Sequence, residues 1–591
     1  MNPLAFIKKH SALCALLAVL AAAVAAPYLI PENPDSAIFR SGAFTALLLI
    51  GCFIPVRRAI EFHYPRTLRY SIGLAFAFTL CLSVGSELFV YDQLLPGLGS
   101  MIRRFAVPVL ASPLIGALIS HALMYRPKNE NAKHLNLPYI CYFLLFTLCY
   151  VLVLLAFFPG IINYDFQGEI GQYYTGNYYA AHPVFHTLFT GVLYKVGGIL
   201  FGSATGSALM YSLVQLVLLA AMYAAACRFV QKRVPAPVML LLILCFTLLP
   251  FHGILAISTV KDALFSGLCL LLCLILWQIA ENPAAFFENR RRILRFSACC
   301  LGIALIRLNG VFAYLPACLV LLLFCRDTNI PVRRGMLIAV PTLLVCLLVP
   351  RGFEFAVHAQ KAPASEMMSI PCQQLMRTAE YADISEEEYA KLNEWFSNVT
   401  FRYHPNYADP AKGNLDYERF VRDPSDFWST YLDYAKRYPQ IYVEAFLSNC
   451  AGLWYPDDRS HAHSMDSEDW DFVYLKAGNI VPEFVGTVEA HSYIPALRKL
   501  LLSSTHSSRH EQIPFLSLIF RPAIYTYLLM FAVFYLNLHR AKRWSLCTLP
   551  IWGILLSLFF SACILVRYAY PIMTAVPVLL ALAFGERATE E

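Results

Sequence analysis

The densest group of titratable side chains in this chain follows the apolar segment that ends at Phe158. Asp165 and Glu169 lie four residues apart just after it, and His182 and His186 follow in the same connection. Carboxylates and imidazoles are the side chains that most often act as general acids and bases. Because a long apolar run comes directly before them, we expect their chemistry to take place at a membrane surface.

Other charged residues lie at the ends of further apolar segments. Lys261 and Asp262 begin one segment, Arg307 ends another, and Arg567 begins the last. An ionised side chain in hydrocarbon costs about 2.5 to 3.5 kcal/mol, so each of them needs a compensating interaction. Two interpretations stay open. Either Lys261 and Asp262 neutralise each other while the arginines extend to the interface, or the cations together bind an anionic headgroup such as a phosphate.

Composition places the chain among polytopic membrane proteins. Its 591 residues are 58% hydrophobic and 14% charged, and the mean hydropathy is +0.55, which no single soluble globule has. Apolar windows of about 20 residues, the length that crosses a membrane, predict fourteen spanning helices. They lie near residues 12–30, 42–56, 70–90, 105–124, 138–158, 207–227, 236–251, 260–279, 294–307, 311–325, 336–350, 515–537, 545–565 and 569–584.

Lysines and arginines predict the orientation of these helices. They cluster on alternate connections, and short cytoplasmic loops carry the excess of basic residues, so both termini are expected in the cytoplasm. Arg103 and Arg104 are an exception on the outer side. Segment 183–201 is apolar, but counting it as a span would move the basic cluster around Arg228 to the outside. We therefore predict that it is a helix lying along the outer surface.

The chain divides into four regions on this basis. Residues 1–135 contain four N-terminal spans, 136–350 a helical core with a long outer loop at 159–206, 351–513 a mixed, mostly α extracytoplasmic domain, and 514–591 the last spans. The extracytoplasmic domain holds 24 of the 39 acidic residues and only 15 of the 46 basic ones. The net charge of +7 therefore reflects the cytoplasmic loops, and nucleic-acid binding is excluded.

Cysteines do not form a disulfide framework in this chain. Most of the eighteen lie in apolar segments, where cysteine acts as a small hydrophobic residue. Cys372 and Cys450 fall in the outer domain and are able to pair if the compartment is oxidising. The sequence contains no P-loop, GxGxxG turn, HExxH helix or CxxC pair with zinc spacing.

A series of short motifs resembles the GT-C glycosyltransferase superfamily. The motifs are FPGIINYD at 158–165, HPVFHTL at 182–188, VKDALF at 260–265, RLNG at 307–310, IPCQQLMR at 370–377, LWYPD at 453–457 and RYAYP at 567–571. Protein O-mannosyltransferases carry a comparable loop aspartate and a His-Pro-Pro run, where this chain has His-Pro-Val. The closer resemblance is to a poorly characterised group of bacterial GT-C-like membrane proteins, and it covers about residues 138–584.

The resemblance implies a mainly α membrane bundle of GT-C type that transfers a sugar, with inversion, at the outer face of the bacterial plasma membrane. The donor would be a polyprenyl-phosphate sugar and the acceptor a glycan, a lipid or a protein. The loop aspartate matches Asp165, which would act as general base. Phosphate-binding candidates are His182, Lys261, Arg307 and Arg567. Candidates for other substrate contacts are Glu169, His186, Asp262, Gln373, Gln374 and Arg377. A divalent cation (Mg²⁺ or Mn²⁺) is compatible with this chemistry but not required.

Several alternatives stay open from the sequence. Asp165 would serve as a helix N-cap if a helix occupied 166–174, and the two histidines would then be packed in a core or at the interface. A lipid-linked glycan flippase or other secondary transporter would also be polytopic, but it should have internal repeats with broken helices near the midplane, and we find no repeat. A structural or assembly protein, with the outer domain as docking module, would need no acid in the loop.

Overall fold

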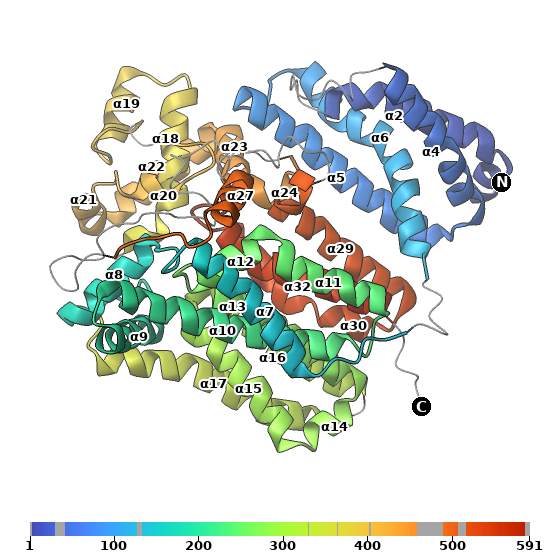
Figure 1. The fold of residues 1–591 in the computed structure, drawn as a ribbon. Coiled ribbons are helices and arrows are strands. Elements are labelled where there is room, and N and C mark those ends of the chain that lie inside the picture. Colours follow the sequence, from blue (N-terminus) through green and yellow to red (C-terminus); the bar gives the residue numbers. More distant parts are fainter. Residues whose placement is uncertain are drawn as a thin grey trace.

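A computed structural model describes residues 3–29, 42–126, 133–328, 330–362, 364–400, 403–457, 488–505 and 516–585. These residues form helices and short connections, with only isolated β-bridges between them, so the predicted mainly α fold is confirmed. Figure 1 shows three groups of helices: an N-terminal unit at the upper right, an outer domain at the upper left and a core bundle below.

The helices of the three groups have the following bounds. The N-terminal unit consists of α1 (Pro3–Lys9), α2 (Ser11–Leu29), α4 (Gly42–Phe62), α5 (Pro65–Tyr91) and α6 (Leu98–Met124). The core bundle contains α7 (Tyr139–Ala156), α8 (Tyr164–Thr175), α9 (Val184–Phe201), α10 (Ala204–Val230), α11 (Ala236–Leu248), α12 (Pro250–Ile257), α13 (Asp262–Glu281), α14 (Pro283–Phe287), α15 (Arg290–Ile306), α16 (Val311–Asp327), α17 (Val332–Ala356), α29 (Pro522–His539), α30 (Lys542–Leu546), α31 (Leu549–Leu558) and α32 (Val566–Phe584). The outer domain contains α18 (Ser369–Tyr381), α19 (Glu386–Asn393), α20 (Asp409–Lys412), α21 (Tyr417–Arg422), α22 (Pro424–Arg437), α23 (Pro439–Asn449) and α24 (Ala451–Trp454).

Ten of the described helices are long and apolar enough to cross a membrane, and the bent pair α11–α12 makes up to eleven. Nine of the ten coincide with predicted spans, and the tenth is α9. The chain is therefore an integral membrane protein by length and composition of its helices. The predicted count of fourteen is not reached by this measure, because α2, α4, α15 and α31 are not among these helices. In α2 and α31 the apolar stretches are shorter, Ser11–Ala26 and Leu549–Leu558.

Contacts place α8 and α9 together at one end of the core bundle, which we call the site end. Gln231, just after α10, accepts from the backbone N–H of Leu137, just before α7 (3.1 Å), whereas Gly160, just after α7, lies against Ser212 near the start of α10. α7 and α10 are thus antiparallel neighbours, and the chain between them leaves and returns at the same end. This arrangement supports the predicted placement of segment 183–201 along the surface, although α9 is apolar enough to span.

The opposite end of the core bundle gathers basic residues, and we call it the basic end. Arg233 after α10 pairs there with Glu281 at the end of α13 (2.5 Å), and Arg540 after α29 donates to the carbonyl of Gly585 after α32 (2.8 Å). Two arginines predicted on the outer side, Arg103 and Arg104, both pair with the buried Glu87 (2.9 and 2.8 Å). This neutralisation explains why they depart from the charge rule that orients the helices.

The predicted span at 236–251 is a broken helix. α11 and α12 meet at an angle of 50° at the break before Pro250. Proline has no N–H, so the carbonyl of Phe246 lacks its partner within the helix. The Tyr150 hydroxyl donates to that carbonyl instead (3.0 Å), and Gln215 donates to the carbonyl of Ser258 just beyond α12 (2.5 Å). These side chains satisfy backbone groups that lipid would leave unpaired.

The predicted span at 545–565 is also different in the structure. It contains α31, whose ten residues rise only about 15 Å, or half of the hydrocarbon core. Beyond α31, the chain makes a turn and a non-helical connection at 559–565, to which the outer domain bonds. The Asn449 side chain donates to the carbonyl of Ser561 (2.8 Å), and the backbone N–H of Ala408 donates to the carbonyl of Ala562 (2.8 Å). This connection leads directly to Arg567 at the start of α32.

Arg377 joins the outer domain to the N-terminal unit. It lies on α18 with no exposed side-chain surface, and it contacts Asp92 between α5 and α6 (3.2 Å), Glu444 on α23 (3.2 Å) and the Tyr403 hydroxyl (2.6 Å). Glu444 also accepts from the backbone N–H of Leu94 (2.9 Å). The N-terminal unit is therefore docked on the outer domain through the connection between α5 and α6.

The core of the outer domain is aromatic. Trp395, Phe427 and Tyr434 are buried in it, so these rings have a packing role. Cys372 and Cys450 are both buried, and no disulfide joins them to each other in the described part of the chain.

Replacing Arg377 by Met should loosen the docking of the N-terminal unit. The substitution leaves Asp92 and Glu444 without their cation, which costs about 3 kcal/mol for a buried pair. We expect a lower midpoint of thermal unfolding for the purified protein and faster proteolysis near residue 92. Arg422→Met is the matched control, because Arg422 is an exposed arginine of the same domain. Equal midpoints for the two variants would contradict the assigned role.

Candidate functional site

Asp165 is positioned by the connection that precedes α8. The side chain of Asn163 accepts from the backbone N–H of Asp165 (3.0 Å), so Asn163 is the N-cap and the alternative that Asp165 caps the helix is wrong. The backbone N–H of Asn163 donates to Thr259 Oγ1 (2.9 Å), and Ile161 bonds with Ile257 and Thr259 through its backbone (3.1 and 2.9 Å). These bonds fix the start of α8 beside the connection from α12 to α13, and leave the Asp165 carboxylate for other contacts.

Two cations face the same oxygen of Asp165. Lys261 Nζ, at the start of α13, lies 3.6 Å from Asp165 Oδ2, and Arg567 Nη1, on the first turn of α32, lies 3.5 Å from it. Lys261 also lies 3.8 Å from Glu169 Oε1 and donates to Nδ1 of His182 (2.9 Å). The structure thus brings together Asp165 and three of the four residues predicted to bind phosphate, from helices far apart in the sequence.

The cations determine the protonation of this cluster. Burial raises the pKa of Asp165, but Lys261 and Arg567 outweigh it and lower the pKa to about 2, so the carboxylate is ionised at neutral pH. Burial and the Lys261 ammonium both lower the pKa of His182, which is therefore neutral with its proton on Nε2. The Asp165 side chain keeps 18% of its surface exposed, compared with 2% for Glu169. Asp165 is the carboxylate that a substrate is able to reach.

Glu169 and His186 form a buried pair behind Asp165. His186 Nδ1 lies 2.9 Å from Glu169 Oε2, and Thr190 Oγ1 donates to the same oxygen (3.1 Å). Gln215 uses its N–H groups on backbone carbonyls, so its oxygen accepts from the Tyr211 hydroxyl (3.1 Å). His186 Nε2 lies 3.2 Å from the Tyr211 oxygen. The imidazole of His186 thus contacts Glu169 through one ring nitrogen and Tyr211 through the other.

This pair has a positioning role. Burial raises the pKa of Glu169, but His186 and Lys261 lower it to about 2. The pair joins α8 to α9 one turn after Asp165, and so orients the helix face that carries both carboxylates. The substrate contacts predicted for Glu169 and His186 are disfavoured, because both side chains are buried and already bonded to each other.

Arg307 and Asp262 pair with each other at the margin of the cluster. The Arg307 guanidinium also lies over the rings of Tyr568 (4.9 Å) and Phe265 (5.8 Å). Lys261 turns instead toward Asp165 and Glu169, so the mutual neutralisation of Lys261 and Asp262 is not the arrangement found. Arg307, whose side chain is 16% exposed, remains near enough to lower the pKa of Asp165.

The three candidates on α18 are engaged within the outer domain. Gln373 donates to two backbone carbonyls of segment 404–405 (2.8 Å each), and Gln374 donates to the carbonyl of Tyr442 (3.0 Å). Arg377 holds the N-terminal unit, as described above. The structure does not bring these residues to Asp165, and their bonds favour a packing role over the predicted substrate contact.

The residues present do not fit a divalent cation. The Lys261 ammonium already lies between the Asp165 and Glu169 carboxylates, where a metal ion would have to bind. Arg567 places a second positive charge beside Asp165. Within the described ranges, no group of three or more His, Cys, Asp or Glu side chains is arranged to hold a metal ion.

Sequence reasoning missed the residues that position the cluster. Asn163 carries a recognisable signal, because Asn two residues before an acid at the start of a helix favours an N-cap. Gln215 carries another, since a polar residue inside the apolar α10 needs a buried partner. Thr259 and Tyr211 offered none, because their partners lie far away in the sequence.

Comparison with known proteins gives one match. Residues 175–591 match a model described as "Family of unknown function (DUF6020)". The match includes His182, Lys261, Arg307 and Arg567, and it begins after Asp165 and Glu169. No curated protein and no solved structure matches the chain. Because the match covers well over half of the sequence, the chain belongs to the DUF6020 family.

Proposed function

We propose that this protein is a membrane glycosyltransferase of GT-C type. It would move a sugar from a polyprenyl-phosphate donor to an acceptor at the outer face of the bacterial plasma membrane. The observation that carries the proposal is the partly exposed Asp165 carboxylate with Lys261 and Arg567 at 3.6 and 3.5 Å, at an end of a membrane bundle. A base beside two cations suits a reaction that removes a proton and releases an anionic phosphate.

The reaction would proceed in one displacement. The acceptor oxygen forms a bond to the anomeric carbon as the bond from that carbon to the phosphate oxygen breaks. The electron pair of the broken bond leaves with the polyprenyl phosphate, whose added charge Lys261 and Arg567 stabilise. The acceptor proton passes to Asp165 and then to water. Attack opposite the leaving group inverts the anomeric carbon. The neutral His182 would donate its Nε2 proton to a phosphate or sugar oxygen.

Donor binding would also strengthen the base. Without donor, Lys261 and Arg567 hold the pKa of Asp165 at about 2, which makes its carboxylate a weak base. A donor phosphate competes for both cations. As they move toward the phosphate, burial remains and raises the pKa of Asp165. The same cations would thus bind the leaving group and release the base only when the donor is present.

One observation favours the second candidate, a lipid-linked glycan flippase or other secondary transporter. The bent pair α11–α12 is the type of broken helix found in such proteins. Transporters of this class carry broken helices in corresponding positions of two repeats, whereas the described helices include one bent pair. The charged residues of the Asp165 cluster also lie at the site end and not near the middle of the bundle. Both points favour the transferase.

Replacing Asp165 by Asn should abolish glycan transfer. Asn has nearly the same shape but accepts no proton, so we expect a loss of at least about a hundredfold, the usual contribution of a general base. The measurement is the mass profile of envelope glycans in a deletion strain that expresses the variant. The membrane abundance of the variant, measured in parallel, should equal that of the wild type.

A matched control for this test is Asp327→Asn. Asp327 is an exposed aspartate at the end of α16, so the same chemical change at the basic end should leave the glycans unaffected. If Asp165→Asn restores the glycans as fully as the wild type, at equal abundance, the enzymatic proposal is wrong and transport or assembly is favoured.

Replacing Lys261 by Met should shift the acidic limb of the pH–rate profile to higher pH. In the enzyme without donor, Lys261 and Arg567 lower the pKa of Asp165, so removing one cation raises it. At limiting donor the rate reports the free enzyme, and the wild-type rate should stay level down to about pH 4. The rate is measured in isolated membranes supplied with limiting donor. Lys261→Arg keeps the charge and should keep the wild-type limb. Identical limbs in Lys261→Met and the wild type would contradict the assigned electrostatics.

A further inference from the structure

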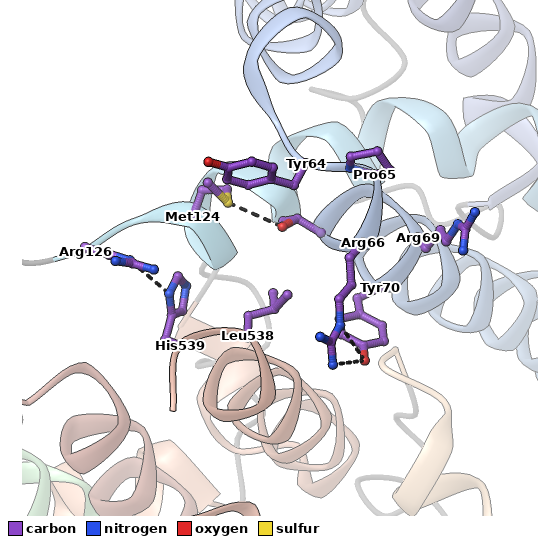
Figure 2. Close-up of a pocket in the computed structure, with 10 residues that line it drawn as sticks. Tyr64, Pro65, Arg66, Arg69, Tyr70, Met124, Arg126, Leu538 and His539 are labelled. Atoms are coloured by element: carbon purple, nitrogen blue, oxygen red, sulfur yellow. Dashed lines mark hydrogen bonds between the residues drawn. The ribbon is translucent and has the colours of Figure 1, made fainter. Parts of the chain in front are cut away.

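A cavity separate from the Asp165 cluster lies at the basic end, between the N-terminal unit and the core bundle. It has a volume of about 770 Å³ and is lined by residues at the start of α5, the end of α6 and the end of α29. Figure 2 shows Arg66 and Arg126 on opposite sides of this cavity, with Leu538 between them and Tyr64 above. The cavity is far along the helices from the site end, so the proposed transfer reaction makes no use of it.

The lining of this cavity is positively charged. The described residues that line it include Arg66, Arg69, Arg126 and His539. The lining contains no Asp or Glu among these described residues. Arg126 donates to Nδ1 of His539 (3.0 Å), and His539 Nε2 donates to the carbonyl of Leu123 (2.5 Å), which directs the Arg126 guanidinium toward the cavity. Arg66 lies near the hydroxyl of Tyr70 (3.4 Å), which it approaches with two of its nitrogen atoms. Tyr70 and His539 thus orient the two arginines without supplying a negative charge.

The backbone adds to this field. α5 begins at Pro65, and its first residues line the same cavity, so the positive end of the helix lies at the cavity wall. Tyr64 and Tyr70 supply an aromatic border of the kind found at the level of lipid headgroups. Two guanidinium groups, a helix start and tyrosines around an open volume match the requirements of a phosphate group.

We propose that this cavity binds a phosphate-bearing anion, and that the anion bridges the N-terminal unit and the core bundle. Arg66 belongs to α5, whereas the Arg126–His539 pair joins the end of α6 to α29, so one phosphate between them would contact both groups of helices. By the distribution of Lys and Arg, the basic end faces the cytoplasm, where anionic lipids attract basic pockets between helices. The phosphate could come from such a lipid or from solution, and the two sources are separable by experiment.

The test uses the full-length protein, purified in detergent. Binding of short-chain phosphatidylglycerol, short-chain phosphatidylcholine and inorganic phosphate is measured by native mass spectrometry and by the midpoint of thermal unfolding. For the paired variant Arg66→Gln with Arg126→Gln, we expect affinity for the binding anion to fall about ten- to thirtyfold. The matched control, Arg58→Gln with Arg290→Gln, removes two exposed arginines that do not line the cavity. It should bind as the wild type does.

Each outcome decides the proposal. Binding of phosphatidylglycerol but not of inorganic phosphate, lost in the paired variant alone, supports a lipid source. Binding of inorganic phosphate with the same loss supports a free anion. Absence of binding by both anions, or equal loss in the control, overturns the site. If the paired variant fails to fold, the single variant Arg66→Gln is tested instead, because an exposed side chain can be replaced without disturbing the fold. Its affinity for the anion should fall about fivefold. Unchanged binding in that variant would also overturn the site.

Discussion

The arrangement of the site depends on how the charge of one ammonium group, that of Lys261, is compensated at the end of a membrane bundle. Lys261 has a side chain that is only 10% exposed, so its charge must be compensated by nearby groups. Asp165, Glu169 and His182 supply them at 3.6, 3.8 and 2.9 Å. Those three residues belong to α8 and the connection after it, which therefore cannot leave the start of α13. The demand for charge balance is what fixes the long loop against the bundle and gives Asp165 its place.

A second constraint is the backbone itself. Wherever the chain is not helical inside the bundle, its N–H and C=O groups need partners that lipid does not supply. Tyr150 donates to the Phe246 carbonyl, which Pro250 leaves without a partner. Gln215 donates to a carbonyl just beyond α12, and Asn163 caps α8. A short parallel bridge between Ile161 and Ser258 completes the set. The irregular segments that carry Asp165 and Lys261 are thus held by hydrogen bonds from polar side chains and from each other's backbone.

Sequence reasoning predicted the parts that depend on local pattern. Each predicted span contains a helix. The surface placement of 183–201, inferred from the charges on the flanking loops, stays a prediction, because α9 is long and apolar enough to span. The grouping of His182, Lys261 and Arg567 around Asp165 also agreed, because charges at one end of several helices must meet. The break at Pro250, the short α31 and the burial of Arg377 were not predicted. Each depends on partners remote in sequence, such as Asn449 for the segment at Ser561, and a single sequence does not show such pairs.

The position of Arg567 depends on the outer domain through a chain of direct contacts. Arg377 of α18 binds Asp92 of the N-terminal unit, and Gln373, one turn earlier on the same helix, holds the carbonyls of segment 404–405. Three residues later, the backbone of Ala408 bonds to Ala562, which lies five residues before Arg567. Since Arg567 is one of the two cations that determine the pKa of Asp165, docking of the outer domain bears on the base itself. Contiguity alone does not make this a signalling route. It does connect the outer domain and the N-terminal unit physically to the cluster, because the outer domain bonds to the segment that leads into the start of α32.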